Sequence, residues 1–241
     1  MTDRGAAERA RRRPVRRDAP PAPAWRRFLL PGLLAVATIG FLVVYFSPLL
    51  GVRAVQVEGN RSLDSDAVVK AAEVAEGTPM LRVDPEQIRE HLHALPKVAD
   101  AQAVLDWPST VRIQVTERAP AAYFRATDGV RLLDVAGVPF ETVADPPTGV
   151  PELRAPKASA DDPATRAALS VLVALPVPVR AEVTAVHAQS QNDIRLELNG
   201  GRSVDWGSVK DTERKALILP PLLTRPGKVY DVTTPALPTV A

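Results

Sequence analysis

An uncharged apolar run near the start of the chain constrains the fold more than any other feature. No charged residue occurs from Phe28 to Val52, and the part from Phe28 to Phe46 is 19 residues long. As a helix this part extends about 28 Å, close to the roughly 30 Å thickness of a bilayer's hydrocarbon core. The run therefore predicts one membrane-spanning helix, residues 28–50. The rest of the 241-residue chain is long enough for one or two folded domains.

The residues on either side of the run predict its orientation. Residues 1–27 contain nine arginines against three acidic residues, whereas the whole chain carries a net charge of only +2. Cytoplasmic flanks are rich in Lys and Arg, so we expect this segment inside the cell and everything after the run outside the cell membrane. Its arginines and prolines cannot bury apolar surface, so residues 1–27 are predicted to be a disordered tail. A cleaved signal peptide is the alternative, but it normally has a shorter apolar region and a small-residue cleavage site.

The run is followed by a predicted small domain, residues 52–118. Alternating apolar residues predict three strands, and two segments with apolar residues at helical spacing lie between the first and second strands. Asp84 followed by Pro85 is typical of a helix start. The order strand, helix, helix, strand, strand predicts an α+β domain with both helices on one face of a three-stranded sheet.

Residues 119–234 predict a second domain that consists mainly of strands. Short alternating segments separated by turn residues indicate antiparallel pairing, and helices are predicted after Asp162 and Ser208. We therefore expect a mainly antiparallel β domain with flanking helices. The proline-rich segment 144–157 is predicted to be a loop. Two prolines in residues 235–241 predict a flexible C-terminal tail that adds no further strand.

The chain lacks the residue patterns of common enzymes and metal sites. It contains no cysteine, which excludes disulfides, Cys-ligated zinc and thiol nucleophiles. His91 and His93 are two residues apart and point to different faces of a helix, and the third histidine is His187. No nucleophile elbow, phosphate loop or dinucleotide fingerprint occurs. We predict no catalytic residue, no metal and no cofactor; a paired-carboxylate hydrolase stays open, since 28 acidic residues allow some pair to meet.

Six ordered motifs resemble one bacterial protein family. They are Val-Glu-Gly-Asn at 57–60, Glu-Arg-x-Pro at 117–120, Leu-Leu-Asp-x-x-Gly-x-x-Phe at 132–140, Asn-Asp-Ile-Arg-Leu at 192–196, Val-Asp-Trp-Gly at 204–207 and Val-Tyr-Asp-Val at 229–232. With the basic tail and the single span, this order resembles the cell division family FtsQ, called DivIB in many Gram-positive bacteria. The resemblance implies that residues 52–118 are a POTRA domain and residues 119–234 the family's β domain.

The resemblance implies a non-enzymatic scaffold of the divisome. Such proteins are single-pass membrane proteins concentrated at the division septum. They bind FtsB/DivIC-like and FtsL-like coiled-coil proteins, and through them influence the FtsW and FtsI septal peptidoglycan synthases. The alternative is a POTRA-type receptor or chaperone in protein export or envelope assembly. A defined divisome partner distinguishes the scaffold, whereas binding of many extended peptides distinguishes the chaperone.

The resemblance also implies where a partner binds. In the family, an FtsB-type partner adds a strand beside the last strand of the β domain, and backbone pairing at such a terminal strand supplies affinity. Aromatic side chains concentrate binding energy, so Tyr230 is the expected anchor. The alternative is that this strand only closes the sheet and that Tyr230 packs. The predicted partner-binding residues are Val229, Tyr230, Asp231, Val232 and Thr233, with Ser203, Val204 and Trp206 of the neighbouring strand.

Charged residues elsewhere have simpler interpretations. Asp64, Arg82 and Glu86 are exposed candidates on the predicted POTRA domain, but charges on a helix face are usually only solvated, so no POTRA site is predicted. The Glu-Arg-x-Pro motif lies where the chain leaves the first sheet. Glu117, Arg118 and Pro120 are therefore expected to have a structural role at the domain junction.

Overall fold

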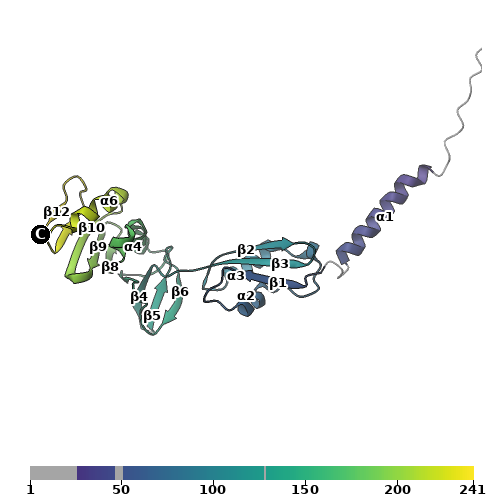
Figure 1. Ribbon diagram of the computed structural model, residues 1–241, viewed down its shortest axis with the longest axis horizontal. Coiled ribbons are helices and arrows are strands. Elements are labelled where there is room, and N and C mark those ends of the chain that lie inside the picture. The colour runs from purple at the N-terminus through teal and green to yellow at the C-terminus, as the bar shows by residue number, and fades with distance from the viewer. Residues whose placement is uncertain (1–25, 47–50, 128) are drawn as a thin grey trace, which may run out of the picture.

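The computed structural model describes residues 26–46, 51–127 and 129–241. A helix, α1 (Arg26–Phe46), is followed along the chain by a small sheet and then a larger one (Figure 1). Within the part of the chain that the structure describes, no helix combines the length and the apolar character that a membrane crossing requires. The predicted disordered tail lies almost entirely outside the described residues.

The first sheet belongs to an α+β unit with the predicted order of elements. Its strand order is β1-β3-β2, with β1 parallel and β2 antiparallel to β3. Val111, Ile113 and Val115 alternate along β3 with polar residues, and all three are buried against the two helices with Ile88 and Leu92. The elements are β1 (Ala54–Glu58), α2 (Ser65–Ala72), the 3₁₀ helix η2 (Met80–Arg82), α3 (Pro85–His93), β2 (Val98–Asp106) and β3 (Thr110–Glu117).

The helices of this unit begin where the sequence predicts. Asp84 is the N-cap of α3, since its carboxylate accepts a hydrogen bond from the Glu86 amide at 2.9 Å, and Pro85 is the first helical residue. Asp64 caps α2 in the same way through the Asp66 amide at 3.3 Å. These caps satisfy amides that have no partner within the helix.

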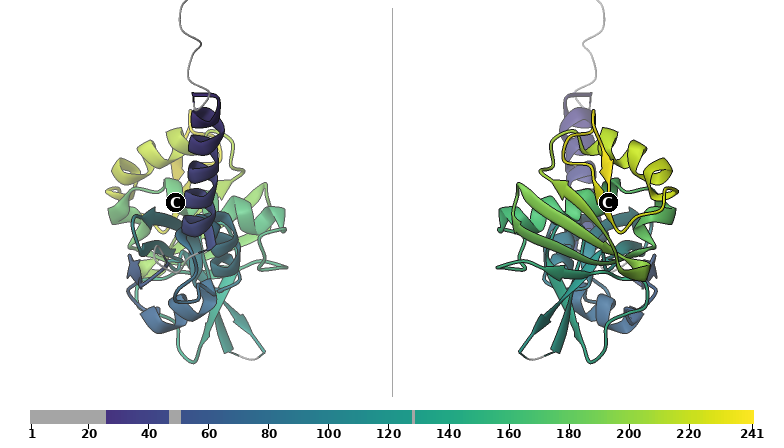
Figure 2. Two further views of the ribbon diagram at one scale, coloured as in Figure 1. Left: turned by 90° about the vertical axis from the view of Figure 1, so that its right-hand side faces the viewer. Right: turned by 90° about the vertical axis from the view of Figure 1, so that its left-hand side faces the viewer.

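The second sheet has nine strands in the order β12-β11-β10-β9-β8-β7-β4-β5-β6. Its strands fan out with a strong twist (Figure 2). Neighbours pair antiparallel except β4–β7, β7–β8 and β10–β11, which pair parallel. The strands are β4 (Ala122–Ala126), β5 (Gly129–Leu133), β6 (Pro139–Val143), β7 (Glu152–Arg154), β8 (Val183–Ser190), β9 (Asp193–Leu198), β10 (Arg202–Gly207), β11 (Val229–Asp231) and β12 (Thr239–Val240).

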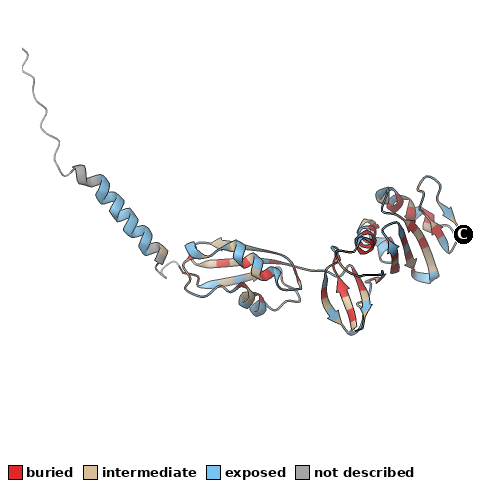
Figure 3. Ribbon diagram, turned by 180° about the vertical axis from the view of Figure 1, so that it is seen from behind, coloured by how far each residue is buried: buried red, intermediate tan, exposed pale blue. Residues whose placement is uncertain are grey.

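Two of the parallel pairs explain why helices flank this sheet. Parallel neighbours need a crossover connection, and α4 (Pro163–Ala174) with α5 (Val177–Arg180) connects β7 to β8, while α6 (Thr212–Leu223) connects β10 to β11. The apolar face of α4 is buried, with Leu172 only 2% exposed. Together with Val186, Leu196 and Trp206 of the strands it forms the main core. Figure 3 shows the buried residues as stripes across the strands.

Two predictions about this part of the chain are wrong. The segment 144–157, predicted as a loop, contains β7 between Pro151 and Pro156, because three residues suffice to bridge β4 and β8. The segment 235–241, predicted to pair no further, contains β12, which pairs antiparallel with β11. The reason is local: both prolines precede Thr239, so the paired residues keep their amides.

Candidate partner-binding edge of the β domain

The structure brings the eight predicted partner-binding residues together at one end of the nine-stranded sheet. β10 and β11 pair in parallel, with Ser203 opposite Val229 and Val204 opposite Tyr230. The amide of Val232 continues this pairing and donates to the Asp205 carbonyl oxygen at 3.0 Å. The amide of Val232 therefore points into the sheet and not toward its outer edge.

Half of these side chains lie inside the domain. Those of Val204, Trp206, Tyr230 and Val232 are at most 1% exposed and belong to the main core. The Tyr230 hydroxyl donates to the carbonyl oxygens of Arg225 at 2.9 Å and Gly227 at 3.0 Å. The expectation that Tyr230 is an accessible anchor is therefore wrong, because its ring packs and its hydroxyl is satisfied. The side chains left at the surface are those of Ser203, Val229, Asp231 and Thr233.

The outer side of β11 is also not free, contrary to the prediction that it is the open edge. The Val229 amide donates to the Ala241 carbonyl oxygen at 3.0 Å, and the Ala241 amide returns a bond of 2.9 Å to the Val229 carbonyl oxygen. Because strand residues alternate, the amide of Asp231 points the same way as that of Val229. The outward groups of β11 thus belong to Val229 and Asp231, and β12 covers them.

Lys215 on α6 is a structural residue of this edge that sequence reasoning missed. It is 1% exposed, and its ammonium group donates to the carbonyl oxygens of Trp206 and Ser208, each at 2.9 Å. Burial lowers its pKa, which the negative charges of Asp211 and Asp231 partly oppose. The available signal was its spacing, since a lysine four residues before Leu219 continues the apolar stripe of α6.

The open face of the sheet joins two of the sequence motifs. Arg195 of the Asn-Asp-Ile-Arg-Leu motif lies opposite Asp205 of the Val-Asp-Trp-Gly motif, and the two side chains form an ion pair. On the neighbouring pair β8–β9, His187 contacts Glu197 at 2.8 Å. Around β8, β9 and β10 this face is therefore polar, and the main apolar core lies on the helix side.

A second cluster of polar contacts lies at the junction of the two sheets. The Glu117 carboxylate accepts bonds from the Ser62 hydroxyl at 2.6 Å and from the Ser62 and Leu63 amides, both at 2.9 Å. Burial raises the pKa of Glu117, but these hydrogen bonds and one from the Arg61 amide outweigh it and lower the pKa to about 2. Glu117 therefore ties the turn after β1 to the end of β3.

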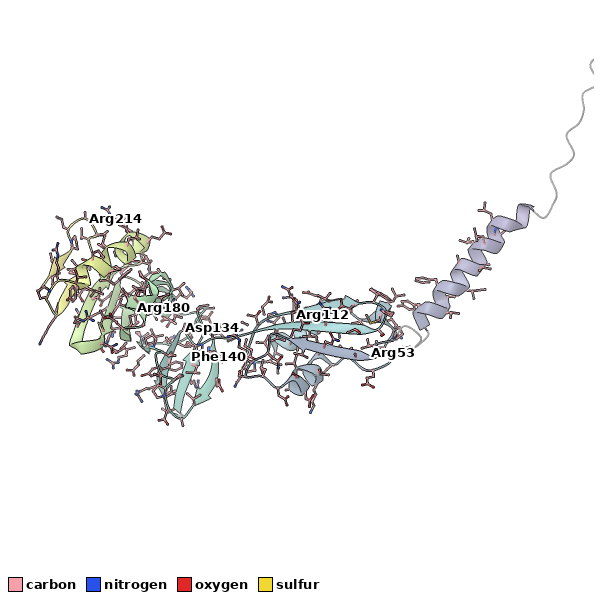
Figure 4. The ribbon with its side chains drawn as sticks, viewed as in Figure 1. Arg53, Arg112, Asp134, Phe140, Arg180 and Arg214 are labelled. Carbon is pink, nitrogen blue, oxygen red and sulfur yellow. The ribbon has the colours of Figure 1, made fainter. Side chains whose placement is uncertain are left out.

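The next residue of the motif connects the two sheets. Arg118 forms an ion pair with Asp134, and its Nε atom donates to the Pro96 carbonyl oxygen at 3.0 Å. A second ion pair at the junction joins Lys97 and Glu141, with 2.7 Å between Nζ and Oε1. Figure 4 shows Asp134 at the narrow connection between the sheets. Glu117 and Arg118 thus have a structural role at the junction, as the motif predicts.

A three-stranded sheet with two helices, followed by a mixed sheet with crossover helices, defines the chain as a POTRA-type protein with a C-terminal β domain. The family model described as "POTRA domain, FtsQ-type" matches residues 50–118. The model described as "Cell division protein FtsQ/DivIB, C-terminal" matches residues 122–232. The chain belongs to the FtsQ/DivIB family of cell division proteins, a family of scaffolds and not a known family of enzymes.

Curated relatives agree with the family models. The cell division protein FtsQ of Mycolicibacterium smegmatis is 43% identical over 88% of this chain, and the chain spans only 62% of that relative. FtsQ of Mycobacterium tuberculosis strain H37Rv is 37% identical, over 98% of this chain and 78% of the relative. The solved extracytoplasmic domain of DivIB from Geobacillus stearothermophilus matches at 20% identity with a TM-score of 0.34, covering 44% of this chain and 87% of that one.

Proposed function

We propose that the chain is a single-pass membrane scaffold of the divisome. Through the end of its β domain it binds FtsB/DivIC-like and FtsL-like proteins and so organises septal peptidoglycan synthesis by FtsW and FtsI. Family membership supports a role in cell division. The observation that carries the partner claim is the end of the nine-stranded sheet, where the strand next to β10 is held on its outer side by only a two-residue strand. Such an edge fits recognition by strand addition.

The membrane anchor in this proposal is residues 28–50, with residues 1–27 in the cytoplasm and the two domains outside. The uncharged apolar run from Phe28 to Val52 in the sequence supports it. Side chains of α1 such as Leu30 and Phe41 are 80% and 59% exposed, and exposed apolar side chains are stable where lipid or a partner covers them.

The domain division is part of the same proposal. Residues 52–118 are the POTRA domain, and residues 119–234 are the β domain. The separate apolar cores of the two sheets support a boundary near the Glu-Arg-x-Pro motif. β12 supports extending the second domain through residues 235–241.

Calorimetric titration tests the partner claim. The full chain in nanodiscs is titrated with the extracytoplasmic segment of the cognate FtsB/DivIC-like protein. Ala241 bonds inward to Val229, so the amide of the residue before it, Val240, points outward from β12. Val240→Pro removes this amide, so we expect affinity to fall at least about tenfold. The matched control is Val240→Thr, which keeps the amide and the branched shape and should bind like wild type. Undetectable binding by folded wild type, or equal binding by Val240→Pro, would overturn the claim.

One observation favours the alternative, a POTRA-type receptor for extended chains. Among the described residues, no strand pairs with the outer edge of β2, which is nine residues long. A long unpaired edge is able to accept an added strand. Titration with several unrelated extended peptides decides between the two: a scaffold binds none of them, whereas a receptor binds most with similar affinity.

A further inference from the structure

We propose that one end of the POTRA domain rests on the lipid surface of the cell membrane. The ligand class is the headgroup layer of a phospholipid bilayer, whose phosphates bind arginine and whose upper acyl chains contact apolar side chains. The inference rests on the proposed membrane anchor and does not involve the partner-binding edge of the β domain. The surface, called the membrane-proximal tip, consists of Arg53, Leu81, Arg82, Val104 and Trp107.

Backbone contacts join the start of this domain to two other segments. The Val52 amide donates to the Thr78 carbonyl oxygen at 2.9 Å, and the Arg53 amide donates to the Ser109 carbonyl oxygen at 2.8 Å. The segment that follows Thr78 and the turn between β2 and β3 therefore lie on either side of the entering chain. Figure 4 shows Arg53 at the end of the first sheet that is nearer α1.

This end of the domain lies at the height of the lipid headgroups when residues 28–50 cross the membrane. Gly51 follows the proposed anchor directly, and a Cβ atom added to it would lie 2.7 Å from the Gly77 carbonyl oxygen. The domain thus begins in close contact with its own backbone at the first residue after the anchor. The headgroup layer is about 5–7 Å thick on each side of the hydrocarbon core, which two extended residues span. Side chains next to residues 51–53 are therefore within reach of lipid.

The exposed large apolar side chains of the POTRA domain are gathered at the same end. In this domain, every residue of which the structure describes, they are Leu81, Val104 and Trp107, with exposures of 45%, 42% and 51%. Leu81 follows two residues after Pro79, which forms a bridge with Gly51. Val104 is near the end of β2, and Trp107 is in the turn after it. Tryptophan is enriched at membrane interfaces because its ring is apolar and its N–H is polar.

Two arginines supply the charge that lipid phosphates require. The side chains of Arg53 and Arg82 are exposed, and within the described part of the chain neither has an ion pair. Arginine binds phosphate through two parallel N–H groups. At the same end, Asp106 is already paired with Arg112, and Glu76 is exposed. One exposed carboxylate against two guanidinium groups leaves the tip positive.

A lipid contact at the tip sets how the rest of the protein stands on the membrane. The first sheet lies between α1 and the second sheet (Figure 1). The ion pair of Arg118 with Asp134 connects the two sheets at their junction. The orientation of the POTRA domain on the lipid surface therefore determines the direction in which the β domain projects.

Quenching of tryptophan fluorescence by lipid tests the proposal. The tryptophans of the chain are Trp25, Trp107 and Trp206, and Trp206 is fully buried. The full chain with Trp25→Phe is reconstituted in phosphatidylcholine and phosphatidylglycerol vesicles, with or without bromine on the upper acyl chains. Adding Trp107→Phe leaves only Trp206, so the difference between the two proteins is the emission of Trp107. We expect brominated lipid to quench at least about half of this emission, because interfacial indoles contact the upper acyl chains.

Equal Trp107 emission in brominated and ordinary vesicles would overturn the proposal. Leu81→Ser and Arg53→Gln should each reduce the quenching at least about twofold, because each removes one kind of lipid contact. Their matched controls should leave quenching unchanged: Leu217→Ser, at a leucine of α6 that is 76% exposed, and Arg61→Gln, in the turn at the other end of β1. If neither Leu81→Ser nor Arg53→Gln reduces quenching, the tip does not hold the turn on lipid and the proposal fails.

An alkaline wash of the vesicles separates failure of this inference from failure of the proposed anchor. A protein with a membrane-spanning anchor stays in the washed vesicles, whereas a protein held only at the lipid surface is removed. If the protein stays and Trp107 is not quenched, the anchor stands and this inference alone is overturned. If the protein is washed off, the anchor fails, and the inference that rests on it fails as well.

Discussion

The junction of the two sheets and the outer edge of the second sheet hold chain segments together by different means. At the junction, charged side chains that are largely buried make several bonds each, and the Arg118 and Asp134 side chains are only 17% and 7% exposed. At the edge, residues 235–241 are held mainly by the backbone bonds of β12, which is two residues long. Charged side-chain contacts therefore fix the junction, whereas mainly backbone pairing closes the outer edge of the second sheet.

Breaking the junction should have the largest effect. Arg118→Ala leaves the buried carboxylate of Asp134 without its cationic partner. Loss of one member of a buried ion pair lowers the free energy of unfolding by about 3 kcal/mol. Urea denaturation of the full chain in micelles, followed by tryptophan fluorescence, measures it.

Arg118→Lys is the matched control for that change. It keeps the positive charge but not the planar fork that reaches both Asp134 and the Pro96 carbonyl oxygen. Its loss of stability should be clearly smaller than that of Arg118→Ala. A loss below about 1 kcal/mol for Arg118→Ala would contradict the view of the junction as a fixed connection.

Replacing the buried cation beneath the edge should have the next largest effect. Lys215→Met keeps the apolar stem but leaves the carbonyl oxygens of Trp206 and Ser208 without their donor. We expect the free energy of unfolding to fall by about 2 kcal/mol in urea denaturation. The same substitution at Lys210, which is exposed, should leave stability unchanged. Equal stability of both variants would show that Lys215 is not needed to hold the end of β10.

The sequence predicts the junction better than the edge, for physical reasons. The first sheet follows from alternation and caps such as Asp84, because local patterns specify its elements. β7 and β12 are two or three residues long and lie next to prolines, so no period can be read from them. Whether Tyr230 is exposed depends on which side of β11 meets the core. Lys215 was missed because lysine is almost never fully buried unless its ammonium group has partners.

The hydrogen bonds to Glu117 predict a pH dependence of stability at the junction. The folded-state pKa is lowered from 4.5 to about 2, so the unfolded state binds the proton more tightly. The stabilisation is therefore present above pH 4.5 and is lost as pH falls toward about 2. Glu117→Gln should lower the free energy of unfolding by about 1 kcal/mol near neutral pH. As the pH is lowered, the free energy of unfolding of this variant should fall less than that of wild type. Urea denaturation at several pH values measures this.

Glu90→Gln is the control for that experiment. Glu90 is exposed on α3, and the same change of charge there should leave the pH profile of stability as in wild type. If Glu117→Gln and Glu90→Gln give the same profile, the bonds around Glu117 do not stabilise the fold.

The smallest effect on stability is expected at the outer edge of the second sheet. Val240→Ala removes two methyl groups from a half-buried position, so the free energy of unfolding should fall by only about 0.5 kcal/mol in urea denaturation. Val209→Ala is the control, since this valine is 42% exposed and lies outside β12, and it should leave stability unchanged. A loss of stability as large as that of Lys215→Met would mean that β12 unfolds together with the core, because only a cooperative part of the fold transmits such a small truncation to global unfolding.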